Sequence, residues 1–95
     1  MENRMINDVN INGIIEIPAL GYNSTTEEYF EEGVMLINVN NITYVEPRYY
    51  RNGNLARYIV VFVGKDNYTY TNQKGYDLIK NSMIRNYEKT EGNIL

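Results

Sequence analysis

Short runs rich in β-forming residues, separated by turn residues, recur along most of the chain, which is the pattern of β-strands. The first such stretch covers residues 9–17, as one strand or as two short strands around Gly13, and Pro18 ends it. Ile, Val, Tyr and Thr are abundant and Ala is nearly absent, so the composition also favours strands over helices. The same pattern predicts four more strands, at residues 34–39, 42–50, 55–63 and 68–71.

Asn52 and Gly53 form the strongest turn signal of the chain. Both residue types tolerate positive φ, so Asn-Gly is the preferred type I′ turn of a two-residue hairpin loop. The sequence therefore predicts a hairpin whose strands flank these two residues. In that register Arg48 lies directly opposite Arg57.

A second segment carries a helix signal. Ser24 and Glu27 have the spacing of a capping box, and Gly33 stands where a helix would end. A short helix over residues 25–32 is one interpretation, and a mobile acidic loop is the other.

The end of the chain changes its period. Tyr76, Ile79, Met83 and Tyr87 recur at spacings of three and four, which places them on one face of a helix. We expect this helix over residues 73–87, with Thr71 or Asn72 capping its start. The predicted architecture is α+β and mostly β: a small antiparallel sheet of about five strands with a C-terminal helix packed on it. Residues 1–95 form one domain, whose ends, 1–8 and 88–95, we expect to be loosely held.

Residues 37–79 resemble the FlbD-type small flagellar proteins and related short proteins of bacteria and phages. The resemblance is carried by Ile-Asn-Val-Asn-Asn-Ile from residue 37, by Tyr-Ile-Val-Val-Phe from residue 58 and by Tyr-Thr-Tyr-Thr-Asn from residue 68. It implies a strand pair, a charged hairpin, a second strand pair and a closing helix. It includes no catalytic signature.

Composition removes several classes of chemistry. The chain has no Cys and no His, which excludes a thiolate nucleophile, a Ser-His triad and a soft-ligand zinc site. No cofactor motif is visible. We therefore expect a protein that is not an enzyme and that uses neither a metal nor a cofactor.

Charge and hydropathy limit the partners. The net charge of -3 disfavours duplex DNA, and no apolar run approaches the ~20 residues of a membrane helix. The N-terminus lacks the apolar region of a secretion signal, so we expect a cytoplasmic protein. Enrichment in Asn, Ile and Tyr is typical of AT-rich coding sequence, which suggests that the source is a low-GC bacterium or its phage. For a phage protein, the expected location is the cytoplasm of the host.

The positive charge is concentrated in the predicted hairpin. Residues 47–64 contain three arginines and no acid, so this segment carries +3 and the rest of the chain carries -6. Two arginines directly opposite each other repel, which normally destabilises a strand pair. Arginine forks suit phosphate or carboxylate, and tyrosine rings stack on bases. The predicted ligand-binding residues are Arg48, Tyr49, Tyr50, Arg51, Arg57 and Tyr58.

Two other interpretations of the arginine pair stay open. Glu46, diagonal to Arg57, and solvent could absorb the charge. Alternatively, a neighbouring subunit could supply counter-charge from its acidic segment, Glu27, Glu28, Glu31 and Glu32. Within one chain, the same four carboxylates read as a solvated face rather than as a metal or acid–base site.

These observations favour a non-enzymatic binding protein that captures a small anionic, nucleotide-like ligand, as a sensor or as a phage-encoded sequestering protein. The alternatives are an FlbD-like adaptor or regulator that binds an acidic protein surface or single-stranded RNA, and a structural phage protein. A chain of 95 residues with ten Tyr and open strand edges gains core by pairing, so we expect a homo-oligomer built from dimers.

Overall fold

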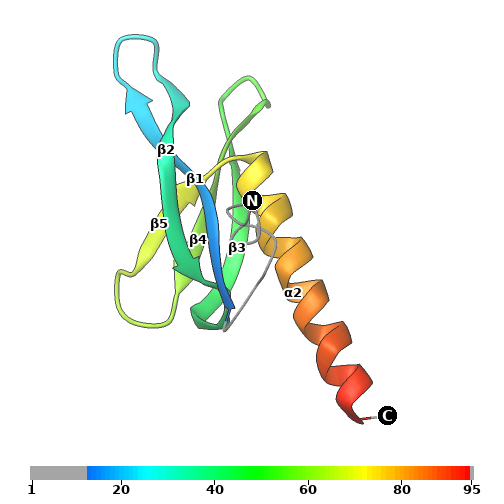
Figure 1. The fold of residues 1–95 in the computed structure, drawn as a ribbon. Coiled ribbons are helices and arrows are strands. Elements are labelled where there is room, and N and C mark those ends of the chain that lie inside the picture. The colour runs from blue at the N-terminus through cyan, green and yellow to red at the C-terminus, as the bar shows by residue number, and fades with distance from the viewer. Residues whose placement is uncertain (1–12, 95) are drawn as a thin grey trace, which may run out of the picture.

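The structure, a computed structural model, describes residues 13–94. Five antiparallel strands are followed by one C-terminal helix, which confirms the predicted α+β class (Figure 1). The short 3-10 turn η2 (Val39–Asn41) joins the second strand to the third. The strands are β1 (Ile14–Asn23), β2 (Glu28–Asn38), β3 (Ile42–Tyr49), β4 (Leu55–Phe62) and β5 (Tyr68–Thr71), and the helix is α2 (Gln73–Ile94).

The strands form two sheets, of order β1-β2 and β3-β4-β5, rather than one. β1 passes beside β5, and the two strands belong to different sheets. A side chain joins them: the buried Thr71 hydroxyl donates to the Pro18 carbonyl oxygen at 2.7 Å. Pro18 has no N–H and so has no donor to offer a neighbouring strand. The two sheets are therefore held together by side chains.

The segment at residues 25–32 is not a helix, so that interpretation was wrong, and its loop is limited to the residues before Glu28. It contains the turn of the β1–β2 hairpin and the start of β2. Asn23 organises the turn: its side-chain oxygen accepts from the backbone N–H groups of Thr25 and Thr26, at 2.9 and 3.2 Å. An Asn side chain bonds turn and helix-start N–H groups in the same way, so the local signal does not distinguish them.

The β3–β4 hairpin has the predicted register along most of its length, with Arg48 opposite Arg57. Its tip differs, because the loop has three residues rather than two. The Tyr50 N–H donates to the Asn54 carbonyl at 2.8 Å, and the Gly53 N–H donates to the Tyr50 carbonyl at 2.9 Å. Gly53 has a φ of +95°, which fits the left-handed position of a three-residue loop.

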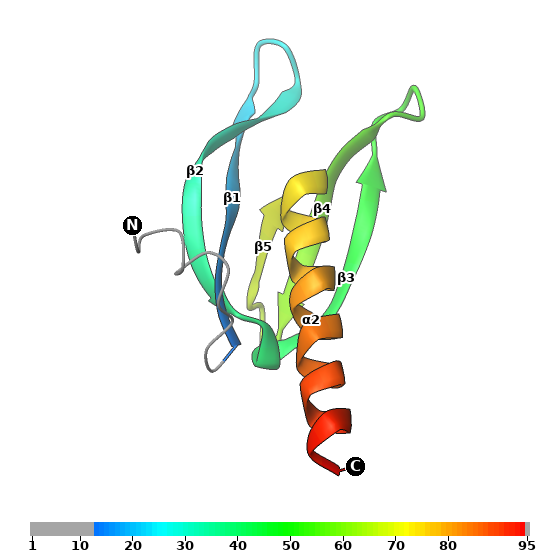
Figure 2. The ribbon, with the colours of Figure 1, turned by 45° about the vertical axis from the view of Figure 1, so that its right-hand side comes forward.

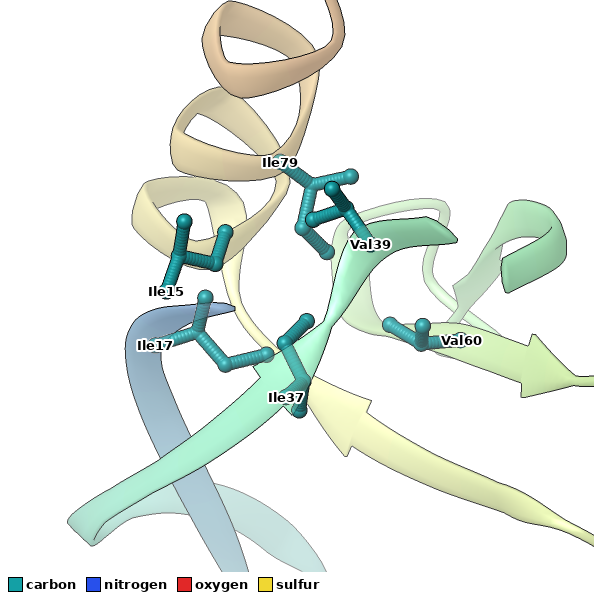
Figure 3. Packing of buried hydrophobic residues seen from close by; sticks show 6 residues of the cluster. All are labelled: Ile15, Ile17, Ile37, Val39, Val60 and Ile79. Atoms are coloured by element: carbon teal, nitrogen blue, oxygen red, sulfur yellow. The ribbon is translucent and has the colours of Figure 1, made fainter. Parts of the chain in front are cut away.

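The hydrophobic core lies where the two sheets and the helix meet. Six buried apolar side chains converge there (Figure 3). In Figure 2, α2 lies in front of the strands, with the tips of both hairpins near its N-terminal end. The core residues are Ile15 and Ile17 from β1, Ile37 from β2, Val39 from η2, Val60 from β4 and Ile79 from α2.

The helix begins as predicted and ends later. The Asn72 side chain accepts from the Gly75 N–H at 3.1 Å, which confirms one of the two proposed caps. α2 continues through Ile94, seven residues beyond its predicted end at Tyr87. The other end of the chain, residues 1–8, lies outside the described residues.

Gly75 marks the closest approach of α2 to β5. It is buried, and a Cβ there would lie 2.8 Å from both Cβ and Cγ2 of Thr71, which is shorter than a van der Waals contact. Thr71 is itself fixed by its bond to Pro18. The absence of a side chain at Gly75 therefore lets the helix start against this contact between the sheets.

We expect Gly75→Ala to lower the melting temperature. Alanine gains up to about 1 kcal/mol of helix propensity, but overpacking a buried contact costs about 1–3 kcal/mol, so the clash decides the sign. Lys74→Ala, an exposed change in the same turn, is the control and should leave the melting temperature nearly unchanged. Thermal unfolding followed by circular dichroism measures both, and a higher melting temperature for Gly75→Ala would contradict this packing.

Candidate functional site

The Arg57 guanidinium packs over two tyrosine rings that meet each other edge-on. Its guanidinium carbon is 4.8 Å from the ring centroid of Tyr29 and 4.6 Å from that of Tyr70. Tyr29 belongs to β2 and Tyr70 to β5, so the arginine of β4 bridges the two sheets. A guanidinium over an aromatic face is attracted by the negative face of the ring, and more strongly when water is displaced. We call these three residues the Arg57 clamp.

The clamp contains no carboxylate. Among the described residues no salt bridge to Arg57 is formed, and its buried Nε–H has no hydrogen-bond acceptor. Glu46 pairs with Arg48 on its own strand instead of with Arg57. The repulsion between Arg48 and Arg57 is therefore reduced in two ways, by Glu46 on one side and by the tyrosine rings on the other.

Tyr50 and Arg51 lie at the tip of the β3–β4 hairpin, beside the tip of the β1–β2 hairpin (Figure 1). The Tyr50 hydroxyl accepts from the Tyr29 N–H at 2.8 Å, which connects the two tips directly. An open groove of about 640 Å³ runs between them, lined by Arg51 on one side and by Glu27 and Glu28 on the other. The acidic segment thus shares a groove with the basic hairpin of its own chain.

Tyr58 does not join the arginines. Adjacent residues of a strand point to opposite faces, so Tyr58 is directed away from the face of Arg57. Its ring is stacked on Tyr76 of α2 at 4.4 Å between centroids and 7° between planes, and its hydroxyl donates to Gln73 Oε1 at 3.0 Å. Tyr49 is 62% exposed. The six predicted site residues therefore do not form one group, because Arg57 lies with the tyrosines of β2 and β5 whereas Tyr58 lies against α2.

The sequence analysis did not identify the tyrosines that surround Arg57. Tyr22, Tyr29, Tyr70 and Tyr68 form a continuous line of rings from the β1–β2 hairpin to β5. Successive centroids are 4.9, 5.9 and 5.7 Å apart, with tilted or edge-on planes. We call these four residues the tyrosine row. The sequence placed Tyr68 and Tyr70 on a strand but left Tyr22 and Tyr29 outside every predicted strand, and it contains no information on which rings meet across two sheets.

No family model, curated protein or solved structure matches this chain. Within the described residues, no group of three acidic side chains is placed to hold a metal ion, and no helix is long and apolar enough to cross a membrane. The clamp, the groove and the tyrosine row are therefore the features of the molecule that bear on its function.

Tyr58 makes stability depend on pH in the alkaline range. Burial raises the pKa of Tyr58 above 10.0, and the neighbouring Tyr76 adds to the shift. Between the unfolded pKa and this higher folded pKa, the folded state keeps a proton that the unfolded state has lost. The free energy of unfolding therefore falls as pH rises through this window.

We expect Tyr58→Phe to make this alkaline loss of stability shallower, although the variant also loses the bond to Gln73 at every pH. Urea unfolding at several pH values between about 8 and 11 measures the slope. A slope as steep as that of the unmodified chain would show that Tyr58 is not responsible.

Proposed function

We propose that this protein is a non-enzymatic binding protein that captures a small anionic, nucleotide-like ligand at the Arg57 clamp. The observation that carries the proposal is the guanidinium packed over Tyr29 and Tyr70, with no carboxylate partner among the described residues. A partly desolvated cation is costly to leave unpaired. A phosphate or carboxylate would supply the missing charge through the planar fork of the arginine.

The three arginines of the hairpin contribute differently to this proposal. Arg57 is half-buried and held in one orientation by the rings. Arg51 is exposed beside the groove and suits a second, weaker contact. Arg48 is already paired with Glu46, so it contributes least. The sequence alone does not rank the three arginines, whereas their contacts in the structure do.

We expect Arg57→Lys to weaken the binding of a nucleoside monophosphate by about 10- to 100-fold. Lysine keeps the positive charge and its attraction to the rings, but it lacks the bidentate fork, and a charge-assisted bond contributes about 1.5–3 kcal/mol. Isothermal titration calorimetry with adenosine monophosphate measures the change. The matched control is Arg48→Lys, at the residue directly opposite, which should change affinity less than 3-fold.

The competing explanation is that Arg57 only joins the two sheets. In that case Arg57→Lys and Arg57→Ala would lower the melting temperature while adenosine monophosphate bound equally well, or equally poorly, to every variant. Measuring melting temperature and affinity on the same preparations separates a structural clamp from a ligand site.

We also propose that the protein self-associates, with dimers as the unit. The outer edge of β3 is not paired within the described chain. An apolar groove of about 340 Å³ lies between β3 and α2, and the buried core residue Ile79 lines it together with the more exposed Met83 and Ile84. The core thus opens to the surface on this side, and a second copy would cover it.

We expect sedimentation equilibrium at micromolar concentration to give about twice the chain mass of 11.1 kDa. Ile84→Glu should shift the mass toward the monomer, because it places a charge in the apolar groove. Lys80→Glu, a charge change at the rim of the same groove, is the control and should shift it less. A monomeric mass for the unmodified chain would exclude the dimer.

A further inference from the structure

The tyrosine row extends beyond Arg57 in both directions, further than one small ligand can use. Its inner rings, Tyr29 and Tyr70, are occupied with Arg57, while its end rings, Tyr22 and Tyr68, are 53% and 55% exposed. A single base covers one ring. The row therefore outreaches a mononucleotide, although Arg57 at its centre suits one phosphate.

We infer that the tyrosine row is a stacking surface for a short single-stranded nucleic acid, whose phosphate is held by Arg57. The inference rests on the proposed function, because it uses the same anion site, and it specifies the class of ligand. Base–aromatic stacking is tolerant of sequence, since every base has a π-face. The expected ligand is therefore a short oligonucleotide of no fixed sequence.

The surface next to the row has the same character. Tyr44 of β3 and Tyr68 of β5 both lie opposite Val61, so all three share one face of the β3-β4-β5 sheet. Tyr44 is 51% exposed. β4 lies between their two strands, so the two tyrosines are about 10 Å apart across the sheet, a span that a short strand of nucleotides can cover and a single base cannot.

Arg57 decides between a nucleic acid and an apolar protein surface. Any partner that covers the tyrosine row buries this guanidinium further. A purely apolar partner would leave the charge unpaired, which is strongly unfavourable. A nucleic-acid strand alternates planar bases with phosphates, so it covers rings and supplies an anion together. A duplex is disfavoured because its base faces are already stacked on one another.

Charge limits how the strand is bound. Glu27 and Glu28 lie beside Tyr29, and the whole chain carries -3, so few phosphates can be favourably placed. With one or two phosphate contacts, at Arg57 and Arg51, we expect a weak dependence on salt. The slope of log affinity against log salt should be about -0.7 to -1.4.

The experiment compares ligand lengths on the intact protein. Adenosine monophosphate and single-stranded oligoadenylates of two, four and eight nucleotides are titrated under one salt condition. We expect affinity to rise with length until the strand reaches both exposed end rings, at about four nucleotides. Tyr22→Ala and Tyr68→Ala should each weaken binding of the octamer about 10-fold and leave the monophosphate unchanged.

Phe30→Ala is the matched control, because Phe30 is an exposed aromatic residue beside Tyr29 on β2 but lies outside the row. If the monophosphate binds as tightly as the octamer, the inference is overturned and the proposed function stands. If neither binds, both fail. Equal losses from Phe30→Ala and Tyr68→Ala would also overturn it, as would binding of an oligoglutamate peptide in place of the octamer.

Discussion

The attraction between Arg57 and the rings of Tyr29 and Tyr70 is the interaction on which the arrangement of the two sheets depends at the hairpin tips. No backbone ladder joins β1-β2 to β3-β4-β5 among the described residues. Near the core, apolar packing and the bond from Thr71 to Pro18 replace it. At the tips, beyond the core, the clamp and the bond from Tyr29 to Tyr50 join the two hairpins.

Much of the fold could be predicted from the sequence because its signals are local. Runs of β-forming residues located β3, β4 and β5 and parts of β1 and β2, although β1 continues past Pro18, where the prediction ended it. The change of period located α2, and the turn at Gly53 set Arg48 opposite Arg57. The site could not be predicted in the same way. Tyr29 and Arg57 lie on different sheets and far apart along the chain, and no periodicity encodes which faces of two sheets meet. The helix predicted at residues 25–32 was wrong for a related reason: the Asn23 side chain accepts hydrogen bonds from a turn in the same way that a helix cap accepts them from a first helical turn.

Charge arithmetic identified the basic hairpin but not its partners. Its acidic complement lies in the same chain, on the other wall of the groove between the hairpin tips. The field around the groove is therefore mixed, and long-range attraction is not what would draw an anion there. What distinguishes Arg57 from Arg51 and Arg48 is local: its rings remove water and fix its orientation, so a short-range contact gains more.

The same residue thus serves structure and, in our proposal, binding, and the two roles reinforce each other physically. A guanidinium between rings keeps part of its donor capacity, because ring faces attract its charge without accepting all of its N–H groups. An anion that used these donors would bind only the folded chain with both hairpins in place, since the rings that orient Arg57 come from both sheets. Binding would therefore favour the closed arrangement of the hairpins over any arrangement in which they separate. A ligand at Arg57 would then strengthen the contact between the two hairpins, which no backbone ladder supports among the described residues.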